Sequence, residues 1–115
     1  MKLFTVVLLA VCSITSRNYW VVDPTTFANS GSVHTHVSVT GWVVYARCED
    51  DGDTHVRIVP TLGATSPFFI AECIPSLPCA KPAVGSRVTV KGISRRDPEH
   101  NWQEIHPVES LETGG

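Results

Sequence analysis

The sequence predicts an all-β fold, a small closed barrel of five strands, and three observations support this prediction. Short segments of alternating apolar and polar residues are separated by glycine and proline, which is typical of half-buried strands. The first of these segments is long and has Gly41 near its centre. The link at residues 75–82 contains three prolines, which argue against a helix because proline removes a backbone donor and clashes with the preceding turn.

The first two predicted strands form a long hairpin, around which the other strands pack. Residues 33–48 alternate in polarity, and the tip at residues 49–53 contains four carboxylates and one glycine. Asp-Gly between two alternating runs is a strong hairpin signal, and residues 54–59 form the return strand. Glycine inside a strand marks a bulge or bend, so Gly41 predicts that the first strand joins two parts of a closed barrel. The residues that share one face of this strand are Val37, Val39, Val43 and Tyr45.

Three further strands complete the prediction. They are residues 68–74, 84–93 and 102–108, with a polar loop at 94–101 and a terminal segment, 110–115, that we expect to fray. Five short strands with a bent first strand favour the five-stranded OB-fold, in which prolines here replace the helix that usually links the third and fourth strands. A small β-sandwich is the alternative architecture.

The N-terminus predicts an exported protein. A positive residue precedes an apolar run at residues 3–14, which is the layout of a secretory signal peptide and is too short to span a bilayer. We therefore divide the chain into a leader at 1–16, an irregular segment at 17–32 and the barrel domain at 33–111. A lipid anchor at Cys12 and a first buried strand are the alternatives for the leader. The expected location is secreted or periplasmic, with no transmembrane segment in the mature chain.

Composition and cysteines narrow the class of protein. A chain of 115 residues with a net charge of -2 is one ordinary globular domain, and this charge argues against a protein that neutralises a long phosphate backbone. An exported domain of this size is expected to contain a disulfide. Cys48 with Cys73 or Cys79 is the predicted pair, because the hairpin and the end of the third strand share one rim of the barrel. A zinc site is less expected, since no Cys-x₂-Cys pair is present.

The residues of the candidate site are expected at the same rim of the barrel. Glu72 has the parity of its apolar neighbours, so we expect it to be partly buried and to have a partner, which His55 could supply. Glu104 and His106 share a face of the last strand. The predicted binding residues are Asp53, His55, Glu72, Asp97, His100, Trp102, Glu104 and His106.

Histidine next to carboxylate allows two kinds of chemistry. It performs general acid/base catalysis near neutral pH or binds a divalent metal, the one cofactor that this pattern suggests. The catalytic candidates are His55, Glu72 and His106, and the metal candidates are His55, His100 and His106. The simpler interpretation is that Glu72 is a satisfied core carboxylate, His106-Pro107 caps the end of a strand and the remaining residues form a solvated rim, because structural ion pairs also perturb pKa values.

Two functions follow from these observations. The first is a non-catalytic barrel that binds a protein, glycan or nucleic-acid ligand. The second is a hydrolase, metal-assisted and nuclease-like, that uses the three catalytic candidates. The nucleic-acid version needs aromatic side chains beside basic ones on a strand face; the aromatics here are few, and tryptophan in a small barrel is more often part of the core.

Four short segments also resemble those of a group of small exported bacterial proteins of unknown function. They are Asp-Gly-Asp-Thr-His at 51–55, Ile-Ala-Glu-Cys-Ile-Pro at 70–75, Asp-Pro-Glu-His at 97–100 and Glu-Ile-His-Pro-Val at 104–108. The resemblance covers about residues 48–108 and implies that the matching residues are the ones gathered at the rim. It implies no activity, and the segment that such proteins carry between the third and fourth strands is shorter here.

Overall fold

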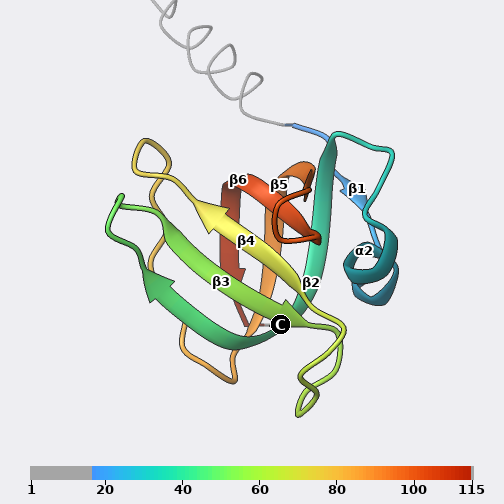
Figure 1. The fold of residues 1–115 in the computed structure, drawn as a ribbon, viewed down its shortest axis with the longest axis horizontal. Coiled ribbons are helices and arrows are strands. Elements are labelled where there is room, and N and C mark those ends of the chain that lie inside the picture. Colours follow the sequence, from blue (N-terminus) through green and yellow to red (C-terminus); the bar gives the residue numbers. More distant parts are fainter. Residues whose placement is uncertain (1–16, 115) are drawn as a thin grey trace, which may run out of the picture.

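The computed structural model describes residues 17–114, which form a closed five-stranded mixed β-barrel with one additional strand and one short helix (Figure 1). The elements are β1 (Trp20–Val21), α2 (Pro24–Ser30), β2 (His36–Cys48), β3 (Thr54–Val59), β4 (Phe69–Cys73), β5 (Arg87–Asp97) and β6 (Trp102–Thr113). The barrel strands follow the order β2-β3-β4-β6-β5, and pairing of β5 with β2 closes the barrel. β4 and β6 are parallel, whereas the other barrel pairs are antiparallel. The prediction of an all-β, OB-like barrel is confirmed.

The bend at Gly41 is confirmed as well. Residues 36–42 of β2 pair with β5, and residues 42–48 pair with β3. A Cβ atom at Gly41 would lie 2.6 Å from Cγ2 of Ile58 and 2.7 Å from the carbonyl oxygen of Val59. Only glycine therefore allows β2 and β3 to approach this closely where β2 passes from one part of the barrel to the other.

The prediction that Tyr45 shares a face of the first strand with Val37, Val39 and Val43 is wrong. Val37, Val39 and Val43 are buried as expected, but Tyr45 is 41% exposed. The register of β2 against β3 shifts between Val43 and Tyr45, and such a bulge reverses the face of the residues that follow it. Ala46 packs against the core instead, and Tyr45 lies on the outer surface.

Residues 17–32 are not irregular, because they contain β1 and α2. The side chain of Asp23 caps α2 by accepting a hydrogen bond from the backbone N–H of Thr26 at 3.0 Å, and Pro24 occupies the first turn, as both residue types prefer. The fully buried Phe27 packs edge-on against Phe69 at 5.2 Å. Within the described residues no helix is long and apolar enough to cross a membrane. The predicted leader at 1–16, including the anchor at Cys12, lies outside these residues.

α2 supplies the helix that an OB-fold usually carries between its third and fourth strands. It contacts β2, β3 and β6 and lies on the opposite side of the barrel from the β2–β3 tip (Figure 1). Phe27 is the residue of α2 that packs into the core cluster of the barrel. In this chain the covering helix therefore precedes the barrel strands instead of lying between the third and fourth of them. The side of the barrel at the β2–β3 tip is left for the site.

The last two strands are longer than predicted. β5 continues to Asp97, and β6 continues to Thr113, so the expected loop at 94–101 shrinks and the segment that we expected to fray is mostly strand. Leu111 pairs with Val90 and packs against the core. The pairing tolerates this length because its register shifts near Gly92, where bulges bend the two strands around the barrel.

The disulfide joins Cys73 to Cys79, with their Cα atoms 5.9 Å apart, so the predicted pairing of Cys48 is wrong. β3 lies between β2 and β4. Cys48 and Cys73 are thus two strand spacings apart, about 9–10 Å, which exceeds the roughly 7 Å limit for a bridge. Cys48 is exposed and forms no disulfide within residues 17–114.

Candidate functional site

A cleft of about 710 Å³ lies between the β2–β3 tip and the turn that joins β5 to β6. Its floor is the outer face of β3, β4 and β6. In OB-folds this face and these two loops are where oligonucleotides and oligosaccharides bind. The ionisable side chains that line it are Arg47, Glu49, Asp51, Asp53, His55, Arg57, Glu72, Arg95, Asp97, His100, Glu104 and His106, and Tyr45 and Trp102 supply aromatic surface.

On the hairpin side of the cleft, His55 and Glu72 form a close pair. They stand opposite each other in the β3–β4 ladder, and Nδ1 of His55 lies 2.6 Å from Oε1 of Glu72. Oε1 of Glu49 lies 4.0 Å from the same nitrogen. Oε2 of Glu49 accepts a hydrogen bond from Arg47 at 2.9 Å. We name Glu49, His55 and Glu72 the hairpin cluster.

The hairpin cluster contains an unpaired buried oxygen. The side chain of Glu72 is 9% exposed, and within residues 17–114 its Oε2 atom is buried without a hydrogen-bond partner. In the same described residues, Nε of Arg57 is also buried without a hydrogen-bond partner. The guanidinium of Arg57 stacks 4.3 Å above the ring of Phe68. In the described part of the chain these are the two buried side-chain atoms without partners, and both residues line the cleft.

The opposite side of the cleft holds a second group, the turn cluster, formed by Asp97, His100, Glu104 and His106. Nδ1 of His100 lies 2.9 Å from Oδ2 of Asp97, and the backbone N–H of Glu99 donates to Oδ1 at 2.9 Å. The hydrogen bond from His100, followed by those from the backbone, holds the pKa of Asp97 at about 2. The same hydrogen bond raises the pKa of His100.

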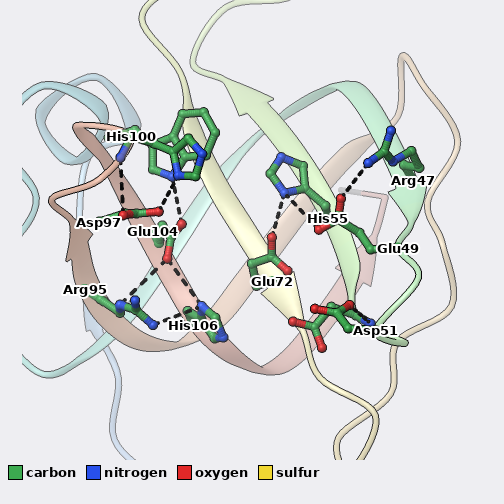
Figure 2. Close-up of polar contacts among 12 residues, drawn as sticks. Arg47, Glu49, Asp51, His55, Glu72, Arg95, Asp97, His100, Glu104 and His106 are labelled. Carbon is green, nitrogen blue, oxygen red and sulfur yellow. Dashed lines mark hydrogen bonds and ion pairs between the residues drawn. The ribbon is translucent and has the colours of Figure 1, made fainter.

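Glu104 is the buried centre of the turn cluster. It is 4% exposed, and the indole N–H of Trp102 donates to its Oε2 at 2.7 Å. Its Oε1 lies 3.3 Å from Nδ1 of His106 and 3.9 Å from Nε of Arg95. His100 stacks on Trp102 with ring centroids 4.5 Å apart. Both carboxylate oxygens of Glu104 therefore have partners, and Figure 2 shows the two clusters as separate groups of contacts.

The structure thus divides the predicted site residues into two sets. His55 and Glu72 meet as expected, and Glu72 is buried. The parity argument for this burial is wrong, because Phe69, Ala71 and Cys73 supply the core face of β4, and Glu72 lies on the opposite, outer face beside His55. Among the contacts of the described residues, His106 pairs with Glu104 and Arg95 rather than with the His55–Glu72 pair. Asp53 lines the cleft, and its backbone N–H donates to the carboxylate of Asp51 at 3.0 Å.

The predicted binding set left out eight residues that line the cleft: Val44, Tyr45, Arg47, Glu49, Asp51, Arg57, Thr65 and Arg95. Glu49 and Arg57 could have been found: Glu49 is one of the tip carboxylates, and Arg57 is two residues from His55 and so shares its face of β3. The position of Tyr45 in the cleft could not be predicted, because the alternation of apolar and polar residues in the sequence does not reveal the bulge that exposes it.

The scan against protein-family models finds no match for this chain, and the search of curated proteins finds none either. The function is therefore inferred from the fold and from the cleft.

Proposed function

We propose that this chain is an exported ligand-binding module that holds its ligand in the cleft over β3, β4 and β6. The observation that carries the proposal is the position of Glu72 Oε2 and Arg57 Nε, two buried polar atoms of cleft residues that have no partner among residues 17–114. Buried polar groups are normally paired, and an exception marks a place where a water, an ion or a ligand completes the set. The position of the cleft on the OB binding face supports the same conclusion.

The charges of the cleft favour a glycan over the protein and nucleic-acid ligands that the sequence also suggested. Six carboxylates and three arginines line the cleft. Arg47 and Arg95 are already engaged by Glu49 and Glu104, so a phosphate backbone would meet a net negative surface. Sugar hydroxyls donate hydrogen bonds to carboxylates, and the half-exposed ring of Tyr45 offers a surface on which a sugar ring packs.

Export is part of this proposal. The disulfide between Cys73 and Cys79 supports an oxidising compartment, secreted or periplasmic. The resemblance to small exported bacterial proteins points the same way, as do the apolar leader and the alternative lipid anchor that the sequence predicts. A whole-cell fractionation that finds the protein reduced and in the cytosol would contradict this part of the proposal.

Titration of ¹⁵N-labelled protein tests the binding function. Chitohexaose, cellohexaose and a single-stranded oligothymidylate are the probes, each at about 50 and about 200 mM salt. We expect a saccharide to shift the amide signals of β3, β4 and β6 at both salt concentrations, and Tyr45→Ala to weaken this binding. Absence of a response to both saccharides, or salt-dependent oligothymidylate binding in the cleft, would contradict the glycan assignment.

A hydrolase that uses the cleft is the second candidate, and the pair of His55 and Glu72 favours it. A carboxylate 2.6 Å from Nδ1 orients the imidazole and leaves Nε2 to act as a general base, with or without a metal, as in the nuclease-like version predicted from the sequence. His106 has other partners, so His55→Gln should abolish hydrolysis of a bound saccharide while His106→Gln retains it. Binding without any cleavage would leave the binding module as the function.

A further inference from the structure

We propose that Glu49, His55 and Glu72, the hairpin cluster, bind one divalent transition-metal cation, for which Zn²⁺ is the best match. The inference goes beyond the proposed function, because it stands whether or not a saccharide occupies the cleft. It also differs from the sequence prediction, which grouped His55 with His100 and His106.

The first observation is geometric. One ligand atom from each of the three side chains lies within 4.8 Å of the other two. A cation with bonds of about 2.0–2.2 Å to nitrogen and oxygen separates its donors by roughly 3–4 Å. Glu49 sits at the start of the hairpin tip with a side chain that is 29% exposed. Nδ1 of His55 lies 4.0 Å from Glu49 but only 2.6 Å from Glu72. Binding therefore requires His55 and Glu72 to separate by roughly 0.5–1 Å, while Glu49 closes on the cation.

The second observation is the unpaired oxygen of Glu72. Its side chain is nine-tenths buried, and in the described part of the chain its Oε2 has no hydrogen-bond partner. A buried carboxylate with one partner is unfavourable, and buried charges are normally paired or coordinate a metal. In Figure 2 the carboxylates of Glu72 and Glu49 both approach the same ring nitrogen of His55, Nδ1. A cation bound by both oxygens of Glu72 would satisfy Oε2 and reduce the repulsion between the two carboxylates.

The types of the donor atoms favour zinc. Imidazole nitrogen suits Zn²⁺ and its neighbours in the transition series, whereas Mg²⁺ and Ca²⁺ prefer sets of oxygen ligands. In the cation-free protein the Nδ1–H of His55 donates to Glu72. The cation takes the place of that proton, which leaves to solvent. The remaining coordination positions face the cleft, where water or a ligand group fills them.

The turn cluster has similar residue types but does not offer the same site. Both oxygens of Glu104 are already engaged, one by Trp102 and the other by His106. Nε of Arg95 lies 3.9 Å from Glu104 and places a positive charge beside it, which opposes a cation. Glu104 is therefore a matched control for Glu72, because both are buried carboxylates on neighbouring strands of one cleft.

Calorimetric titration of the untagged protein with ZnCl₂ tests the proposal. A Cys48→Ser background removes the exposed thiol, which would otherwise bind zinc itself. We expect one site per chain that binds Mg²⁺ far more weakly. Glu72→Gln and Glu49→Gln should each lower the Zn²⁺ affinity at least about tenfold, whereas Glu104→Gln should leave it unchanged.

The folding of each variant is checked by thermal unfolding. If Glu72→Gln fails to fold, Glu49→Gln decides, because the partly exposed side chain of Glu49 is not part of the core. Failure of the Cys48→Ser protein to bind Zn²⁺ at unit stoichiometry would overturn the proposal, as would an equal loss of affinity in Glu104→Gln. Since this titration contains no saccharide, its failure is independent of the glycan assignment.

Discussion

The two sides of the cleft contain almost the same residue types but differ in how completely these residues are paired. In the turn cluster, Glu104 has a partner at each oxygen, and Asp97 accepts hydrogen bonds from His100 and from the backbone. In the hairpin cluster, Glu72 has a partner at one oxygen, while the other is buried and unpaired among the described residues.

This difference separates a structural role from a binding role. A fully satisfied polar network rigidifies its surroundings, whereas an unsatisfied buried group is unfavourable until something binds to it. The turn cluster therefore serves to hold Trp102 and the β5–β6 turn in place. The hairpin cluster is the side of the cleft that acquires a ligand. Four predictions probe this contrast, in order of decreasing effect.

The largest expected effect is on stability, when each buried carboxylate is removed. Glu104→Ala leaves the indole N–H of Trp102 without its acceptor and removes the carboxylate that His106 and Arg95 share, so we expect a loss of about 2–3 kcal/mol in the free energy of unfolding. Glu72→Ala removes one hydrogen bond together with an unfavourable unpaired oxygen, and should cost about 1 kcal/mol. Urea unfolding of both variants in metal-free buffer gives the comparison. A larger loss for Glu72→Ala would contradict the contrast.

Trp102→Phe should have an intermediate effect. It removes the donor to Oε2 of Glu104 but keeps an aromatic ring for stacking against His100, so we expect a cost of about 1 kcal/mol. Trp20→Phe is the matched control, because Trp20 is 59% exposed and stacks on His34. Urea unfolding should find the control close to the parent protein. Equal losses for the two variants would show that the indole N–H of Trp102 contributes nothing specific.

The contribution of the turn cluster to stability should decrease at both low and high pH. Asp97 has a pKa of about 2 against an ordinary value of 3.8, so its contribution to stability is present above 3.8 and is lost as the pH falls toward 2. The pKa of His100 is raised above its ordinary 6.5, so its contribution is present below 6.5 and is lost as the pH rises through the raised value.

Asp97→Asn should therefore lower the pKa of His100 toward 6.5, as followed by NMR. Glu112→Gln, at an exposed position on β6, is the control and should leave the titration of His100 unchanged. A His100 titration that is the same in Asp97→Asn as in the parent would show that the hydrogen bond between them is absent in solution.

The smallest effect is expected at Arg47. Its pair with Glu49 is exposed, and such pairs contribute little to stability, so Arg47→Gln should unfold like the parent. The same substitution removes a positive charge that competes for Glu49, and the affinity for Zn²⁺ should rise a few-fold. Calorimetry measures this change, and a fall in affinity would count against Glu49 as a ligand.

The sequence predicted those parts of the molecule that depend on local patterns. Thr54–Val59 is found as predicted, because it is bounded by a turn and a proline. The bend at Gly41 followed from a glycine in the middle of a long strand, and the meeting of His55 with Glu72 followed from the expected antiparallel order of the first three strands. These features need only the order of the strands and the absence of a side chain at glycine.

The remainder depends on tertiary details that leave no such pattern. The bulge after Val43 exposes Tyr45, and the position of β3 between β2 and β4 keeps Cys48 away from Cys73. Helix α2 did have a signal, since Asp23 and Pro24 are preferred at a helix start; the same pair is equally typical of a turn. The unpaired oxygen of Glu72 could not be predicted, because it depends on which side chains surround it in the fold.

The most direct test of the account is a long-range ¹H–¹⁵N spectrum of the histidine rings during titration of the Cys48→Ser protein with ZnCl₂. We predict that the first equivalent of Zn²⁺ shifts Nδ1 of His55 strongly while the ring nitrogens of His100 and His106 keep their positions. Equal shifts in the turn cluster, or no shift at His55, would contradict the claim that the hairpin cluster is the part of the cleft built to acquire a ligand.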